Sequence, residues 1–172
     1  QRQMCIRDSN KGTCSAGQYY VRNGNAADRT CHSCGTGRYQ GSNGHRTTSC
    51  SACAKGKYQN ENAKSSCKNC GTGKYLTTTA NDAASDCTTC ATSDVHSQAH
   101  AVSASAGSDA SSDCYATSCK KGYYVDGSGA TATCAACSAG QYQTTDGGTS
   151  CSSCSAGWIT NTGTSTGAST CD

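Results

Sequence analysis

The sequence predicts a small, disulfide-rich fold that is mostly irregular, with short β-hairpins, almost no helix, and similar repeats stacked in tandem. Three observations lead to this prediction. Sixteen of the 17 cysteines follow one repeating pattern, and such self-similarity is typical of stacked arrays. Large apolar side chains are scarce. No segment carries the apolar stripe of an amphipathic helix.

Each repeat opens at the second cysteine of a C-x-x-C pair and closes at the first cysteine of the next pair. Glycine stands three residues after the opening cysteine in seven of the eight repeats, with Ser93 as the exception. Tyrosine stands five residues after it in six repeats, and Val95 and Ile159 take that place in the others. The opening cysteines are Cys14, Cys34, Cys53, Cys70, Cys90, Cys119, Cys137 and Cys154, and the closing cysteines are Cys31, Cys50, Cys67, Cys87, Cys114, Cys134, Cys151 and Cys171. The tyrosines, which we expect to pack against neighbouring disulfides, are Tyr19, Tyr39, Tyr58, Tyr75, Tyr124 and Tyr142.

Within a repeat the elements are expected in a constant order. The C-x-x-Gly segment predicts a tight turn, because glycine adopts backbone conformations that other residues resist. The following residues, such as 37–40 and 140–143, predict a short strand, and a polar loop then leads into a second extended piece. The Ala-rich run 99–110 also contains Ser and Gly and is expected to be loop. The longest loop, residues 91–113, is where we expect a bend or a special contact.

Composition indicates that disulfides replace an apolar core. The chain has one Leu, two Ile, four Val, one Trp and no Phe, too little to offset an ordering cost of about 1.5 kcal/mol per residue. About a tenth of the residues are Cys, which is typical of disulfide scaffolds. A disulfide that closes a loop of about 15 residues contributes about 3 kcal/mol. We therefore expect an oxidising location, extracellular or at the cell surface.

The pattern leaves two pairing schemes for the cysteines. Closure of each repeat on itself joins 14–31, 34–50, 53–67, 70–87, 90–114, 119–134, 137–151 and 154–171, and uses all sixteen patterned cysteines. An interlocked scheme that bridges alternate cysteines of neighbouring repeats would leave unpaired cysteines at the ends. We prefer closure within repeats, although sequence by itself does not decide connectivity.

The pattern also suggests how the chain is organised. Residues 1–9 fall outside it, and their back-translation resembles the transposon end sequence used in preparing sequencing libraries; we expect them, with Cys5, not to belong to the protein. Five cysteines recur after 84 residues, which indicates a larger block of four repeats. We thus expect a partial block at 10–33, a full block at 34–118 and a truncated second block at 119–172.

Other features of the sequence bear on nucleic-acid, membrane and metal binding. The net charge of +3 is scattered without a basic run, so nucleic acid and anionic lipid are not expected, and no apolar stretch is long enough to span a membrane. Four-cysteine zinc sites share the C-x-x-C spacing, but the run of repeats is unbroken by spacers. The segments 82–87 and 109–114 each carry two Asp and suggest either calcium ligands or solvated loop ends.

Nothing in the sequence indicates an enzyme, and no cofactor is expected. The histidines are scattered and form no nucleophile–base arrangement; they are His32, His45, His96 and His100. O-linked sugars are expected on the Ser- and Thr-rich loops, such as 77–79 and 160–170.

The string C-x-x-G-x-Y, followed by C-x-x-C, as in residues 34–39 and 50–53, resembles the cysteine-rich repeats of TNF-receptor-like and ephrin-receptor-like modules. The larger blocks resemble the surface (immobilisation) antigens of ciliates. The resemblance covers residues 14–171 and implies an elongated, disulfide-laddered extracellular rod. The absence of Pro and the wide pair Cys114–Cys119 depart from the animal receptor modules and favour a protist surface protein.

Two classes of function follow from this interpretation. The favoured one is a non-enzymatic building block of a surface coat or filament, which associates with copies of itself. The alternative is a receptor-like ectodomain that binds a protein ligand. A receptor should present an exposed apolar or aromatic patch, and only Trp158 and its neighbour Ile159 are candidates.

Overall fold

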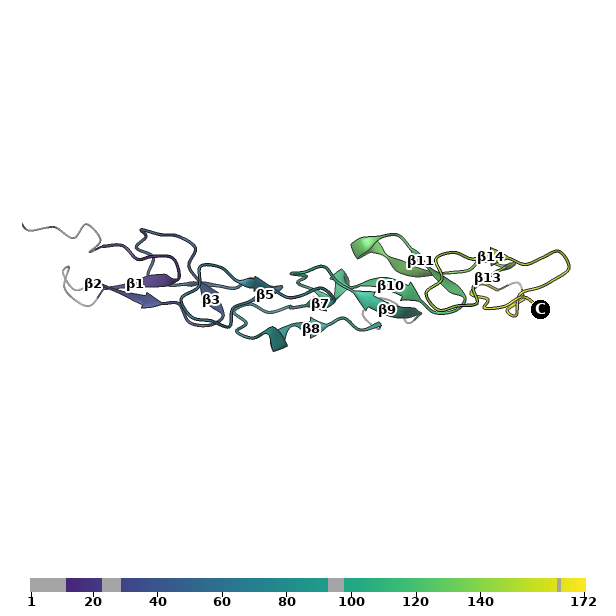
Figure 1. Cartoon of the computed structure of the whole chain (residues 1–172), viewed down its shortest axis with the longest axis horizontal. Coiled ribbons are helices and arrows are strands. Elements are labelled where there is room, and N and C mark those ends of the chain that lie inside the picture. The colour runs from purple at the N-terminus through teal and green to yellow at the C-terminus, as the bar shows by residue number, and fades with distance from the viewer. Residues whose placement is uncertain (1–11, 23–28, 93–97, 164) are drawn as a thin grey trace, which may run out of the picture. The chain divides into compact units, whose positions relative to one another are not determined.

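The computed structural model describes residues 12–22, 29–92, 98–163 and 165–172 (Figure 1). It confirms the predicted fold class, because short antiparallel hairpins and disulfides dominate it. Helical structure in the described part is short: it comprises the 3-10 turns η1 (Ala84–Asp86), η2 (Ser111–Asp113) and η3 (Gly129–Thr131), and Thr92 is also helical. The predictions for residues 1–9, Ser93, Val95 and His96 fall outside the described residues.

Seven two-stranded antiparallel hairpins are present among the described residues. They pair β1 (Gln18–Arg22) with β2 (Arg29–Ser33), β3 (Arg38–Tyr39) with β4 (Ser51–Ala52), β5 (Lys57–Tyr58) with β6 (Lys68–Asn69), β7 (Lys74–Tyr75) with β8 (Thr88–Thr89), β9 (Ala99–Ser103) with β10 (Tyr115–Cys119), β11 (Tyr123–Asp126) with β12 (Thr133–Ala136), and β13 (Gln141–Tyr142) with β14 (Ser152–Ser153). The second strand usually contains the two residues between the cysteines of a C-x-x-C pair. The pair therefore ends one repeat and starts the next without a linker.

The opening turn forms as predicted. Gly17 and Gly37 have φ angles of 79° and 71°, in the left-handed region that favours glycine. Their carbonyls accept the amide hydrogens of the next opening cysteines, Cys34 and Cys53, at N···O distances of 2.8 and 2.9 Å. Each turn thus anchors the start of the following repeat.

The Ala-rich run does not stay a loop. Its first residues form β9, which pairs with β10 through a register that shifts twice. Ala99 and Ala116 are buried together with Cys119 and Cys134, and Val102 packs against this cluster. Burial of Ala99 in this cluster favours the strand, so the interpretation of residues 99–103 as loop was wrong.

The chain divides into two compact units. Unit 1 comprises residues 1–69 and 78–86, and unit 2 comprises 70–77 and 87–172. The core of each consists largely of sulfur, since the largest fully buried side chains are Cys14, Cys34, Cys53, Cys70, Cys119 and Cys137. Among the described residues, no helix has the length and apolar character needed to cross a membrane.

Candidate interaction site at the repeat junctions

The structure joins sixteen cysteines in eight disulfides. The pairs are Cys14–Cys31, Cys34–Cys50, Cys53–Cys67, Cys70–Cys87, Cys90–Cys114, Cys119–Cys134, Cys137–Cys151 and Cys154–Cys171. Every bridge links the opening and closing cysteines of one repeat. The bridges therefore staple repeats individually, and contacts between repeats depend on other interactions.

Backbone hydrogen bonds connect most repeats to the next one. The carbonyl of an opening cysteine accepts an amide hydrogen from the loop of the following repeat, at N···O distances of 2.7–2.9 Å. The donors and acceptors are Ala63 to Cys34, Ala80 to Cys53, Gly107 to Cys70, Gly147 to Cys119, and Gly167 to Cys137. All five donors have positive φ. We name these donors the stacking residues.

At three of the opening turns, three successive repeats meet at the glycine. A Cβ on Gly17 would lie 2.1 Å from the carbonyl oxygen of the stacking residue Ala63, which belongs to the repeat after next. The equivalent separations are 2.2 Å for Gly37 from Ala80 and for Gly122 from Gly167. The glycine is therefore required both by backbone conformation and by the close approach of another repeat.

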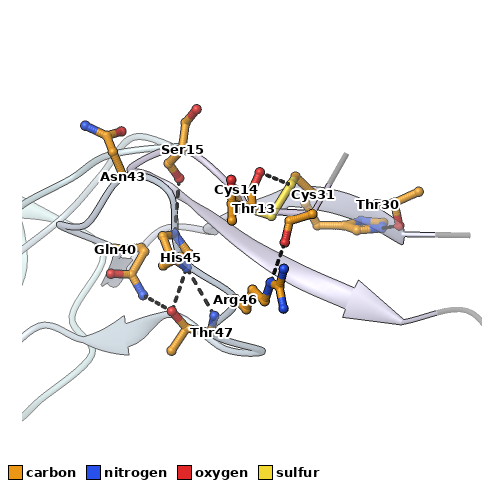
Figure 2. The surroundings of a disulfide bond; sticks show 12 residues. Thr13, Cys14, Ser15, Thr30, Cys31, Gln40, Asn43, His45, Arg46 and Thr47 are labelled. Atoms are coloured by element: carbon orange, nitrogen blue, oxygen red, sulfur yellow. Dashed lines mark hydrogen bonds between the residues drawn. A yellow bond between two sulfur atoms is a disulfide. The ribbon is translucent and has the colours of Figure 1, made fainter. Parts of the chain in front are cut away.

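The first junction shows how side chains support this stacking (Figure 2). Backbone hydrogen bonds link Cys14 and His45 in both directions, at 2.8 and 3.3 Å. The His45 ring contacts the Ser15 carbonyl through Nε2 at 3.3 Å and the Thr47 hydroxyl through Nδ1 at 2.6 Å. A carbonyl only accepts hydrogen bonds, so Nε2 carries the proton and Nδ1 accepts from Thr47. His45 thus holds the first two repeats together through hydrogen bonds.

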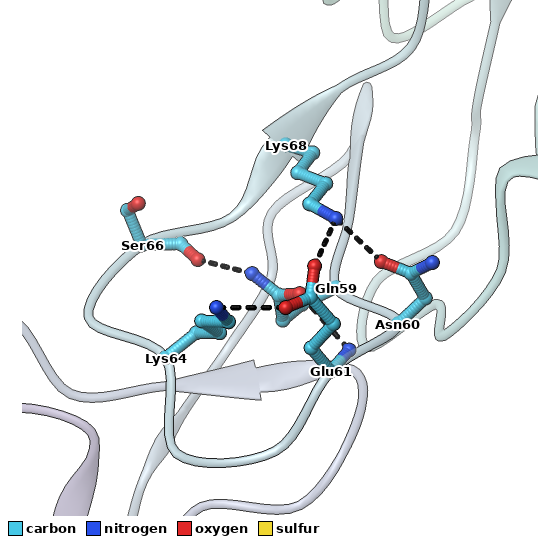
Figure 3. Close-up of polar contacts among 6 residues, drawn as sticks. All are labelled: Gln59, Asn60, Glu61, Lys64, Ser66 and Lys68. Carbon is cyan, nitrogen blue, oxygen red and sulfur yellow. Dashed lines mark hydrogen bonds and ion pairs between the residues drawn. The ribbon is translucent and has the colours of Figure 1, made fainter.

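A glutamine that directly follows the phased tyrosine holds the loop of three repeats. In the most buried case, Gln59 is 2% exposed; its Oε1 accepts from the amide of Glu61 at 3.0 Å, and its Nε2 donates to the Ser66 carbonyl at 2.7 Å (Figure 3). Gln143 makes the equivalent bonds to the amide of Thr145 and the carbonyl of Ser150. The sequence pattern did not predict this role, although the Tyr-Gln dipeptide occurs three times at the same position of the repeat.

The phased tyrosines are partly buried in every repeat where they occur. Three of them, Tyr19, Tyr39 and Tyr142, line a cavity with the following repeat, with volumes of about 300, 170 and 330 Å³. Each cavity is also lined by residues of the next repeat at equivalent positions: the one after the opening cysteine, the one four places after it, and the closing cysteine. We call these cavities the junction grooves.

The residue four places after the opening cysteine differs most between the grooves. It is Arg38 in the Tyr19 groove, Lys57 in the Tyr39 groove and Trp158 in the Tyr142 groove. The Tyr142 groove is also lined by Thr144, Ser155 and Thr170, and none of the described residues that line it is charged. Trp158 is 58% exposed there, so a large aromatic surface faces solvent beside a preformed cavity.

Charge is divided unevenly between the two units. Without residues 1–9, unit 1 has nine Lys and Arg against four Asp and Glu, a net charge of +5, and unit 2 has three against six, a net charge of −3. Among the described cations of unit 1, Lys64 and Lys68 form ion pairs. Glu61 contacts Lys64 at 2.7 Å and Lys68 at 2.5 Å (Figure 3), and hydrogen bonds from these two ammonium groups lower the pKa of Glu61 to about 2.

The paired aspartates of segments 82–87 and 109–114 have a structural use. Asp86 Oδ2 accepts the amides of Asp82 and Ala83, and Asp113 Oδ2 accepts those of Asp109 and Ala110, at 2.9–3.2 Å. These carboxylates thus hold the 3-10 turns that precede the closing cysteines. Across the described ranges, no three His, Cys, Asp or Glu residues are grouped to hold a metal ion.

Comparison with known proteins identifies the class of repeat. Residues 42–87 and 122–171, more than half of the chain, match the family described as tyrosine-protein kinase ephrin type A/B receptor-like. No curated protein matches the chain. The family is a receptor-like cysteine-rich domain rather than a class of enzyme, and its disulfides place the repeats outside the cell or on its surface. With its self-closed repeats and short hairpins, the chain belongs to this ephrin-receptor-like family of cysteine-rich repeats.

Proposed function

We propose that the chain is a receptor-like ectodomain that binds a protein ligand through the Tyr142 junction groove. The observation that supports this function most directly is Trp158, which is 58% exposed at the rim of a cavity of about 330 Å³. Tryptophan and tyrosine supply much of the binding energy at protein interfaces, because they bury large areas and lose little conformational entropy. The groove thus offers an aromatic anchor with hydroxyl groups around it.

The exposure of Trp158 belongs to its position in the repeat. Arg38 and Lys57 occupy the equivalent position in unit 1, where further repeats follow them, and both residues are exposed. The fourth position is therefore exposed at Arg38 and Lys57 within a continuous array as well. Ligand recognition at these exposed positions would use the cations Arg38 and Lys57 in unit 1 and the aromatic Trp158 in unit 2.

A pairwise binding screen tests the proposal. The oxidised chain, presented as a multimer to increase avidity, is screened against a panel of extracellular ectodomains that includes the chain itself. We expect a partner other than the chain to bind, and Trp158→Ser to weaken this binding by about 30-fold or more. Ile159→Ser is the matched control, because Ile159 is adjacent and 69% exposed but does not line the groove. Equal binding by Trp158→Ser and the unaltered chain would refute the role of the groove.

A second candidate function is a structural one, in which the chain associates with its own copies as a building block of a surface coat or filament. The observation that favours it is the charge difference between unit 1 and unit 2, since opposite net charges attract copies to one another. The resemblance to ciliate surface antigens and the Ser- and Thr-rich loops suggest a protist coat carrying O-linked sugars. Electron microscopy of native material is expected to show a regular layer or filaments under this hypothesis, and dispersed single molecules would contradict it.

A further inference from the structure

We propose that the Tyr19 junction groove binds an acidic sugar residue of an anionic polysaccharide, and that Arg38 holds the carboxylate or sulfate group of this sugar. The inference is independent of the proposed protein ligand, which uses the Tyr142 groove. The Tyr19 groove has a volume of about 300 Å³, which is typical of the smaller sites for small molecules. Its size therefore suits a sugar residue rather than a folded segment of a protein.

Arg38 is held in the groove by its own repeat. It lies in β3, is exposed, and its Nη1 donates a hydrogen bond to the Cys50 carbonyl at 3.0 Å. This bond fixes the direction of the planar guanidinium and engages one of its five N–H donors. The other donors form a fork that matches the oxygens of an acidic group, which a lysine does not provide.

The other side chains of the groove suit the neutral part of a sugar. Ser33, Thr48 and Ser49 line it, and each has a hydroxyl that both donates and accepts hydrogen bonds, as sugar hydroxyls do. Tyr19 adds a partly buried ring with an apolar face for the C–H groups of the sugar. None of the described residues that line the groove is acidic. One fixed cation among neutral groups is the combination that an acidic sugar requires.

A groove of this kind stays open inside a continuous array. The Tyr39 groove lies between the second and third repeats, and within unit 1 the first repeat precedes them and residues 78–86 follow them. It keeps a cavity of about 170 Å³ and an exposed Lys57. The Tyr19 groove therefore belongs to a type of junction that further repeats do not fill.

The charge of unit 1 favours an anionic polysaccharide over a neutral one. Without residues 1–9 its net charge is +5, and among its described residues Lys55 and Lys57 form no ion pair. This field attracts polyanions to the surface, where the groove then selects the acidic sugar. A polysaccharide also offers many equal acidic residues, which increases its avidity for any one groove.

Binding of the oxidised chain to immobilised polymers, followed by surface plasmon resonance, tests the inference. The probes are polygalacturonate, which carries carboxylates; dextran sulfate, which carries sulfates; neutral dextran; and polyglutamate as an acidic polypeptide. We expect at least one of the two anionic polysaccharides to bind, more weakly as salt is added, and their comparison distinguishes carboxylate from sulfate. Failure of both to bind, or tighter binding of polyglutamate, would overturn the inference.

Two aspartate variants separate the groove from diffuse attraction. Gly35 lines the Tyr19 groove, and Ala54 has the equivalent position in the Tyr39 groove, one residue after the opening cysteine. Gly35 has no positive φ and its Cβ position meets no heavy atom within 4 Å, so the fold accepts a side chain there. Gly35→Asp should weaken binding by about 10-fold or more, because like charges meet. Ala54→Asp adds the same charge to unit 1 and should weaken it by only about twofold. Equal effects would overturn the role of the Tyr19 groove.

Replacement of Arg38 tests the guanidinium itself. Arg38→Lys keeps the charge but loses the fork, and it should weaken binding by about fivefold. Lys57→Gln removes a charge and should weaken it by only about twofold. Unaltered binding by Arg38→Lys would overturn the assignment. Trp158→Ser should bind polysaccharide like the unaltered chain, so failure of this inference leaves the proposed protein ligand untouched.

Discussion

At the scale of single residues, glycine determines whether repeats can stack. The glycine three residues after the opening cysteine is visible in the sequence as a turn residue. The structure adds that its missing side chain leaves room for the carbonyl of the repeat after next, as Gly37 does for Ala80. Two glycines in equivalent positions can therefore contribute differently to stability, according to whether another repeat lies against them.

Replacement of Gly37 by Ala is expected to destabilise unit 1 by about 3 kcal/mol. Left-handed backbone costs an Ala about 1 kcal/mol, and a Cβ placed 2.2 Å from the Ala80 carbonyl forces further displacement. Gly140→Ala is the matched control: its φ of 79° causes the same backbone strain, but its Cβ meets nothing within 4 Å, so we expect about 1 kcal/mol. Denaturant unfolding followed by tyrosine fluorescence measures both. Equal effects would show that the close approach is unimportant.

The stability contribution of Glu61 should depend on pH. The pKa of its carboxyl is lowered from 4.5 to about 2 by Lys64 and Lys68, so the folded state favours the ionised form. The contribution is therefore present above pH 4.5 and is lost as the pH falls toward 2. Because Glu61 is exposed, the effect is small and screened by salt. Unfolding midpoints of the unaltered chain and Glu61→Gln should differ near neutral pH and converge at the acidic end; a constant difference would contradict this.

At the scale of elements, each hairpin depends on its loop being held as well as on its disulfide. The strands β5 and β6 have two residues each, too few to stabilise a hairpin in water by themselves. The Gln59 side chain bridges two backbone groups across the loop between them. A buried side chain thus supplies hydrogen bonds that the short ladder lacks.

Gln59→Leu should destabilise its repeat by about 2 kcal/mol, because the Glu61 amide hydrogen and the Ser66 carbonyl lose two part-buried hydrogen bonds. Leucine itself fits this position in the next repeat, where Leu76 is 4% exposed, so poor packing is not the cause. Gln143→Leu serves as the control: Gln143 makes equivalent bonds but is only partly buried, and we expect about 1 kcal/mol. Amide hydrogen exchange in the two loops measures both changes. Unaltered exchange at Glu61 would contradict the bridging role.

The disulfide pairing is a prediction that mass mapping of the unreduced protein can check. We expect peptides that link each opening cysteine to the closing cysteine of its own repeat, such as Cys53 to Cys67. Closure within a repeat agrees with the hairpin register, because Tyr58 faces Lys68 next to the closing cysteine. Peptides that link Cys31 to Cys34, or free thiols with bound zinc, would contradict it.

At the scale of the whole molecule, stability comes from many small stapled repeats. The buried residues are mostly Cys and Ala, and the large apolar side chains are few. A repeat closed by one disulfide buries little surface and gains order only by contact with its neighbours. The disulfides and the stacking therefore depend on each other.

Reduction should unfold the chain nearly cooperatively. Each closed loop of about 15 residues loses about 3 kcal/mol of stabilisation, and the remaining apolar surface is insufficient to compensate. Circular dichroism in the near ultraviolet, recorded with and without reductant, measures the loss of fixed tyrosine environments. A reduced chain that keeps this signal would contradict the prediction. As a control, the reduced cysteines are alkylated so that the disulfides cannot form again during the measurement.

The sequence by itself determined the repeat, its boundaries, the opening turn and the reliance on disulfides. These features depend on residue types with special chemistry, Cys, Gly and Tyr, which mark each period by their spacing. Only the tertiary structure decided which loop contacts which repeat, that residues 99–103 form a strand, and that Tyr142 and Trp158 line one groove. The physical reason is that stacking uses backbone amides and carbonyls, which every residue carries, so the sequence holds no signal for the partner. A groove between two repeats exists only once both have folded and met.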